Sequence, residues 1–149
     1  MGTPYDKIFK LFLDLIEDLD WALEDDYEVV YNQLASLMRM AVFKFKRPRI
    51  PLIMDDVNQC FELELTSSEI QVIVILMRAE YRNKELDKWQ NNTYEFEDVD
   101  HRKTSKANFI DKLQKNVLMS KKEAKEALQI YDRTNDARPL RELAGGSRR

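Results

Sequence analysis

The fold is decided by one stretch of the sequence, Thr66-Ser67-Ser68-Glu69-Ile70-Gln71-Val72-Ile73-Val74-Ile75-Leu76-Met77. It opens with a capping box, T-x-x-E, whose first and fourth residues can satisfy the free backbone N–H groups at a helix start. The residues that follow are apolar on nearly every side, which is typical of a helix buried among neighbours. A buried strand is the alternative for such a β-branched run, but the capping box and the polar continuation at 78–88 favour a helix. We therefore expect a central helix at about 67–88.

Two helices are expected before this central one. Thr3-Pro4-Tyr5-Asp6 is a good helix start, and apolar residues then recur at helical spacing, which predicts a helix at about 4–20. The acidic stretch 18–28 contains a break, with Asp25 or Asp26 as the cap of a second helix at about 27–46. One face of that helix is apolar and predicts its buried side: Val30, Leu34, Leu37, Met38, Ala41 and Phe45.

The connection between the second helix and the central one begins at Pro48 and Pro51, which force an extended chain. Apolar residues alternate with acids over 60–65, a period of two that indicates one buried face. A lone strand has no partner within this chain. We favour a loop packed by Phe61, Leu63 and Leu65, and the alternative is an edge that pairs with another copy.

The C-terminal part is expected to hold a long loop, a long helix and a tail. Residues 90–103 are polar and predict the loop. Thr104 or Ser105 can cap a last helix at about 105–132, roughly 40 Å long. A second capping box at 120–123 leaves a break near Ser120 as an alternative. The tail contains Pro139, Gly145 and Gly146, from which we expect an extended segment with at most one helical turn.

Composition agrees with an all-α fold. The chain has 149 residues, 44% hydrophobic and 34% charged, which suits a single core. Three Gly and four Pro are too few for a protein of many short strands. We expect a small bundle of about four helices at 1–132, with the extended tail at 133–149. No signal-peptide pattern and no stretch of about 18 apolar residues is present, so we expect a soluble protein with no membrane partner.

Residues with catalytic or metal-binding potential are few. His101, the only histidine, lies in the polar loop, and Cys60, the only cysteine, has no base beside it in sequence. One cysteine excludes a disulfide framework, and this pair alone gives no plausible zinc site. The sequence also holds no glycine-rich phosphate loop and no G-x-S-x-G motif. We therefore expect a protein that is not an enzyme and takes no metal and no cofactor.

The net charge of −3 hides an uneven distribution. Residues 1–28 carry nine acids and two lysines, residues 39–49 carry five bases and no acid, and residues 133–149 carry five arginines and two acids. Such segregation can orient a contact between subunits, although solvated helix faces are the alternative, and weak contact with phosphate stays open. The expected subunit-interface residues are Arg39, Lys44, Lys46, Arg47, Arg49, Asp18, Asp20, Asp25 and Asp26.

Three segments carry a resemblance to a known family: Leu65–Tyr81, Ser105-Lys106-Ala107-Asn108-Phe109-Ile110 with the charged helix after it, and Phe43-Lys44-Phe45-Lys46. Over about 5–132 they resemble the neck, or head–tail connector (adaptor), proteins of tailed bacteriophages. Tyr81 matches the aromatic residue that the family typically carries after L-M-x-x-E in the central helix. The resemblance does not extend into the tail beyond Asp132.

The resemblance implies a virion structural protein of the phage neck, made in the host bacterial cytoplasm. Such adaptors assemble as a ring, usually of twelve copies, beneath the portal protein, extend the DNA channel and receive further neck or tail-completion proteins. Non-specific contact with packaged DNA is open for the basic segments. In many adaptors the C-terminal segment docks on the portal. Two leucines among arginines predict a docking segment here, and a disordered terminus with incidental leucines is the alternative. The residues of the expected segment are Arg138, Leu140, Arg141, Leu143, Arg148 and Arg149. The alternative function is a small helical regulatory or nucleic-acid-binding protein.

Overall fold

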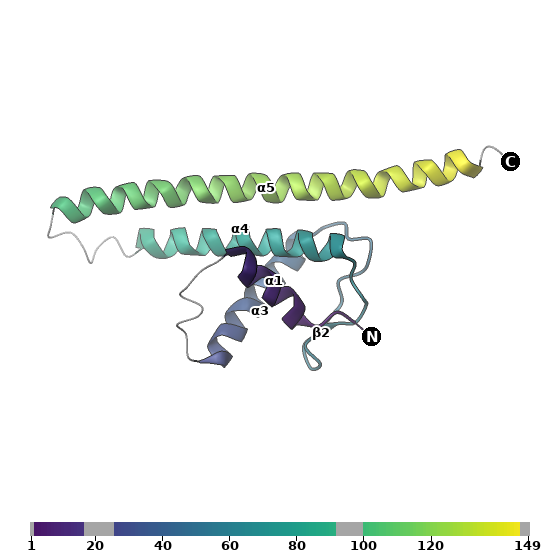
Figure 1. Ribbon diagram of the computed structural model, residues 1–149, viewed down its shortest axis with the longest axis horizontal. Helices are drawn as coiled ribbons and strands as arrows, with labels where there is room; N and C mark the ends of the chain where they lie inside the picture. The colour runs from purple at the N-terminus through teal and green to yellow at the C-terminus, as the bar shows by residue number, and fades with distance from the viewer. Residues whose placement is uncertain (1, 17–25, 92–99, 147–149) are drawn as a thin grey trace.

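The computed structural model describes residues 2–16, 26–91 and 100–146, with side chains described outside 100–105 and 135–146 (Figure 1). Its fold is all-α, as the sequence predicts. The described elements are α1 (Tyr5–Ile16), α3 (Tyr27–Lys44), β1 (Met54–Asp55), β2 (Cys60–Phe61), α4 (Ser67–Asn91) and α5 (Asp100–Gly146). The expected second and third helices therefore agree with α3 and α4 to within a few residues at each end. The end of the expected first helix, 17–20, lies outside the described residues.

Helix α4 is the centre of the molecule, as its nearly all-round apolar first half predicts. Helices α1, α3 and α5 all pack against it. Figure 1 shows α4 and α5 running along each other, with α1, α3 and the hairpin on the opposite side of α4 from α5. Helix α5 extends beyond α4 at both ends (Figure 1). The compact body therefore sits on the middle part of one much longer helix.

The core is built from the apolar stripes that helical spacing predicts. Ile8 and Phe12 of α1, Met38 of α3, and Ile73 and Met77 of α4 are fully buried. Burying a side chain of this size stabilises the fold by about 1.5–3 kcal/mol. The face of α3 that the sequence predicts to be buried, from Leu34 to Phe45, is buried, and Val30 at its start is half-buried. These long-range contacts fix three helices against one another.

The connection between α3 and α4 contains a small hairpin, which corrects the expectation that residues 60–65 have no partner strand. Strand β2 pairs antiparallel with β1, and Pro4 forms a bridge to Cys60. The turn is closed by Asp55, whose carboxylate accepts hydrogen bonds from the backbone N–H groups of residues 57 and 58. Phe61 and Leu65 are buried as expected, whereas Leu63 is 42% exposed.

Helix α5 is continuous, so the alternative of a break near Ser120 is wrong. Ser120 does not cap a new helix, because its side chain is buried and its hydroxyl accepts a hydrogen bond from Arg82, with Nη1 at 2.6 Å from Oγ. Leu113, Val117 and Ala124 are buried on the same helix, as their spacing predicts.

The backbone of residues 133–146 continues α5 as a helix, whereas the sequence predicts an extended segment with at most one helical turn. Pro139 removes one backbone hydrogen bond, but the arginine, leucine, glutamate and alanine residues after it are good helix formers. Adding turns to an existing helix also avoids the cost of nucleation. The expected loop at 90–103 is shortened in the same way, because α4 reaches Asn91 and α5 begins at Asp100. Residues 92–99 lie outside the described residues.

Candidate functional site

The capping box at the start of α4 forms as predicted and is anchored by a buried carboxylate. Oε2 of Glu69 accepts a hydrogen bond from the backbone N–H of Thr66 at 3.1 Å and another from the Thr66 hydroxyl. Only 1% of Glu69 is exposed, although the residue lies in the first turn of a helix. The negative charge lies near the positive end of the helix dipole, which favours it.

Tyr131 of α5 completes this arrangement. Its hydroxyl donates to Oε1 of Glu69 at 2.7 Å and accepts the backbone N–H of Arg49 at 2.8 Å. Its ring packs edge-on against Phe45, with the ring centroids 4.9 Å apart. Burial alone raises the pKa of Glu69, but the hydrogen bonds from Thr66 and Tyr131 outweigh it, so the pKa lies below its ordinary value. We call Thr66, Glu69, Tyr131 and the backbone of Arg49 the junction network.

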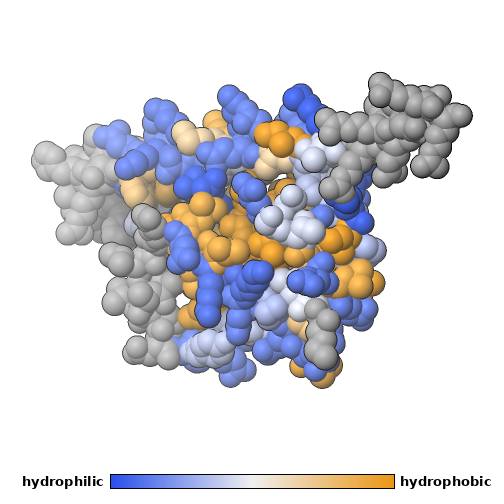
Figure 2. All heavy atoms as spheres, turned by 45° about the vertical axis from the view of Figure 1, so that its right-hand side comes forward, coloured by the Kyte–Doolittle hydropathy of each residue, from blue (hydrophilic) through white to orange (hydrophobic). Residues whose placement is uncertain are grey.

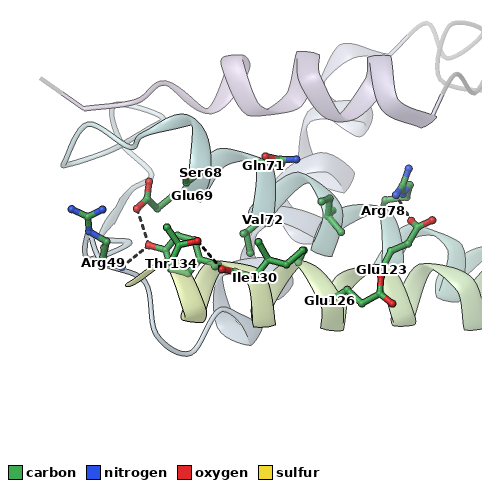
Figure 3. A pocket seen from close by; sticks show the side chains of 13 residues that line it. Arg49, Ser68, Glu69, Gln71, Val72, Arg78, Glu123, Glu126, Ile130 and Thr134 are labelled. Atoms are coloured by element: carbon green, nitrogen blue, oxygen red, sulfur yellow. Dashed lines mark hydrogen bonds and ion pairs between the residues drawn. The ribbon is translucent and has the colours of Figure 1, made fainter. Parts of the chain in front are cut away.

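A groove of about 410 Å³ runs between α4 and α5 from the junction network. In Figure 3, Arg49 and Glu69 lie at one end of this groove, and Arg78 and Glu123 lie at the other. Arg78 and Glu123 form an ion pair through Nη2 and Oε2. Val72, Ile75 and Ile130 are among the apolar residues that line the groove, and Figure 3 shows Val72 and Ile130 between its two ends.

A second groove, of about 510 Å³, lies between α1 and α4. Leu11 and Leu15 form its α1 side and are 43% and 39% exposed, respectively. The two grooves share Gln71, Ile75 and Arg78, so they flank one ridge of α4. Figure 2 shows apolar side chains gathered in a band between hydrophilic ones on one face of the molecule. We call the two grooves and their ridge the grooved face.

The grooved face has the chemistry of a docking surface. Its carboxylates are Glu69, held by the junction network, Glu123, paired with Arg78, and the exposed Glu126. Its cations are exposed or ion-paired at the margins, and its floor is apolar. Such a surface can bury an apolar strip of another chain and orient it by charges at the rim.

The basic residues expected at a subunit interface divide into two groups. Arg39 pairs with Asp56 at 3.3 Å, and Lys44 pairs with the buried carboxylate of Glu80. The second group is exposed and forms no ion pair with another described residue: Lys46, Arg47 and Arg49. The positive charge available to a partner is therefore smaller than the sequence indicates.

The acidic residues expected at that interface fall mostly outside the described part of the chain. Asp26 is described and caps α3, with its carboxylate accepting the backbone N–H of Glu28 at 3.0 Å. Asp18, Asp20 and Asp25 lie outside the described residues.

The structure places the backbone of the expected docking segment but leaves its contacts undescribed. Arg138, Leu140, Arg141 and Leu143 belong to the last turns of α5, and their side chains lie outside the described part. Arg148 and Arg149 lie beyond the described residues altogether.

Cys60 is a half-buried free thiol in β2, and the side chain of His101 lies outside the described part. In the part of the chain that is described, no group of three or more His, Cys, Asp or Glu is placed to hold a metal ion. None of the described helices is long and apolar enough to cross a membrane.

No protein-family model, curated protein or solved structure matches this chain. The site is therefore assigned from its own residues. Sequence reasoning found Glu69 through the capping box, and Tyr131 follows Val117 and Ala124 of the last helix at a spacing of seven residues. It missed the hydrogen bond between Glu69 and Tyr131, because they are 62 residues apart and no local pattern reports on such a contact. It also missed the grooved face, because Leu11 and Leu15 are among the apolar residues of the first helix, and helical spacing alone assigns such residues to the core.

Proposed function

We propose that this chain is a non-enzymatic structural protein of a tailed-phage virion. It acts as a head–tail connector, or adaptor, that forms a ring between the portal and tail components and extends the DNA channel. The observation that carries the proposal is α5, whose 47 residues correspond to about 70 Å and which extends past the body at both ends (Figure 1). One long helix with a small body lets a subunit reach several neighbours at once, and this supports the sequence resemblance over 5–132.

Ring assembly needs two unlike, complementary patches on each subunit. The three exposed cations Lys46, Arg47 and Arg49 supply one candidate patch. The acid-rich segment 17–28 supplies charges of opposite sign. Pairing of this kind orients subunits and weakens as salt is added. A ring of twelve copies is the stoichiometry that the resemblance implies.

The proposal includes docking of the C-terminal segment on the portal through the leucines and arginines named above. Truncation after Asp132 removes this segment and keeps Tyr131, and with it the junction network. We expect the truncated chain to lose the helical signal of 133–146 only, to stay mostly helical with a melting temperature close to that of the full chain, and to lose co-sedimentation with portal rings. Portal binding retained by the truncated chain would exclude the docking role. Failure of the full chain to co-sediment would count against the connector function itself.

A second candidate function, nucleic-acid binding, rests on one exposed aromatic residue. Phe43, in the last turn of α3, is 85% exposed, and Lys46 and Arg47 follow it within four residues. An exposed ring beside free cations can stack on a base while the cations contact phosphates. Fluorescence anisotropy with labelled single-stranded and double-stranded DNA over a salt series tests this. Binding that Phe43→Ala abolishes would favour this candidate, and no binding at low salt would exclude it.

A further inference from the structure

The grooved face is a largely apolar surface that stays partly exposed in the described part of the molecule. Leu11, Leu15 and Ile130 on its two sides are between 39% and 62% exposed, although all three are large apolar residues. Together the two grooves provide room of the size that ordinary ligand and peptide sites offer. A surface of this kind is typical of a contact with another chain.

The same chain carries a helical segment that projects from the body. Residues 135–146, which we call the arm, continue α5 past the N-terminal end of α4 (Figure 1). Because the arm continues a helix that is already formed, it can meet a partner without the cost of nucleating a new helix. The sequence places Ala137, Leu140 and Ala144 at the spacing of one helix face, with Leu143 beside it.

The arm cannot fill the grooved face of its own copy. Because α5 is one continuous helix through Gly146, the arm leads away from the groove that begins at Tyr131 and Thr134. A second copy presents the same face with no such restriction. The dimensions agree as well, since the α4 side of the first groove, Ser68–Arg78, is about 15 Å long and the twelve-residue arm is about 18 Å long.

We infer that the arm of one copy lies in the grooved face of a second copy. The apolar stripe of the arm packs on the ridge of α4 and between Leu11, Leu15 and Ile130. The arm carries two acids and two arginines, and the groove is flanked by the exposed Lys7 and Glu126. Because both surfaces carry charges of both signs, no net repulsion opposes the contact. Arm and groove are different surfaces of the same chain, which makes the contact heterologous and allows it to close into a ring.

This inference rests on the proposed function only in that the arm overlaps the segment that is proposed to dock on the portal. It concerns the portal-free protein, and when portal is present the arm has two competing sites. Self-association and portal binding are separate measurements, so the two proposals fail separately. A groove variant also separates them, because it removes the site for the arm and leaves the arm itself intact.

Two full-length variants test the inference by sedimentation velocity. The groove variant carries Leu11→Ser and Leu15→Ser, both at exposed positions, and the arm variant carries Leu140→Asp and Leu143→Asp. Val57→Ser is the control, because Val57 is 92% exposed on the hairpin, away from the grooved face. Circular dichroism verifies that every variant is folded.

We expect wild type and the control to self-associate and each variant to weaken the association about a hundredfold or more. An equimolar mixture of the two variants should form a one-to-one heterodimer, because one partner has an intact arm and the other an intact groove. Wild type that stays monomeric up to about 1 mM overturns the inference, since even millimolar contacts are detectable there. Variants that associate like wild type overturn it too, and so does a mixture without heterodimer.

Discussion

Replacing Tyr131 with phenylalanine removes one oxygen from the buried centre of the junction network and keeps the ring that packs on Phe45. The carboxylate of Glu69 then loses a hydrogen bond, and the backbone N–H of Arg49 loses its acceptor. A hydrogen bond to a charged group contributes about 1.5–3 kcal/mol, and a buried group left unpaired adds a penalty. We expect the free energy of unfolding at pH 7 to fall by about 2–3 kcal/mol, measured by urea unfolding followed by circular dichroism.

The pH dependence of this loss gives a second readout. Because the folded-state pKa of Glu69 is lowered, its ionised carboxylate stabilises the fold above the ordinary pKa, and this contribution disappears as pH falls through the lowered value. Tyr131→Phe removes one of the bonds that keep this pKa low. The difference between variant and wild type should therefore be largest near neutral pH and shrink below about pH 4.

Tyr27→Phe is the matched control for Tyr131→Phe. Tyr27 is 72% exposed, and the same change there should alter stability by less than about 0.5 kcal/mol. A loss for Tyr131→Phe no larger than that of the control, or one that is the same at every pH, would refute the structural role of the network.

Three further changes test other parts of the molecule. A Cβ at Gly2 would collide with the backbone carbonyl oxygen of Phe61 in β2, so Gly2→Ala should lower the free energy of unfolding by about 1–3 kcal/mol and lower the melting temperature. An unchanged melting temperature would contradict the close approach. Lys44→Met leaves the buried carboxylate of Glu80 without its cation and should lower the free energy of unfolding by about 1–2 kcal/mol, a modest loss because Lys44 is half-exposed. Adding Glu80→Met should recover stability, and a further loss would argue against the pair. The double variant Arg47→Glu and Arg49→Glu should weaken assembly on portal rings, and most strongly at low salt, because salt screens exposed charges within about 8–10 Å at 0.1–0.15 M. Assembly equal to that of wild type across a salt series would show that these arginines are only solvated surface residues.

The helices were predictable because local signals mark them. The capping box at Thr66 places the start of α4, and Asp26 places the start of α3, since both side chains satisfy backbone N–H groups at helix ends. Apolar spacing then identifies which residues meet in the core. These signals act within one or two helical turns and need no knowledge of the rest of the chain.

The remaining features depend on contacts that such signals do not report. The strands of the hairpin are two residues long, too short for a periodicity, so the pairing of β1 with β2 is set by the Asp55 turn. Tyr131 and Glu69 meet only after α5 packs along α4. Pro139 indicates a helix end by itself, yet the helix before it is already formed and continues to Gly146.

The connector function itself is tested most directly by electron microscopy of purified portal rings incubated with the full chain. Under the proposed function, the portal to use is that of the same phage as this chain. We predict an additional ring layer on one end of the portal, coaxial with the channel and lost when Leu140 and Leu143 are both replaced by aspartate. Bare portal rings, with the full chain folded but unbound, would contradict the connector function.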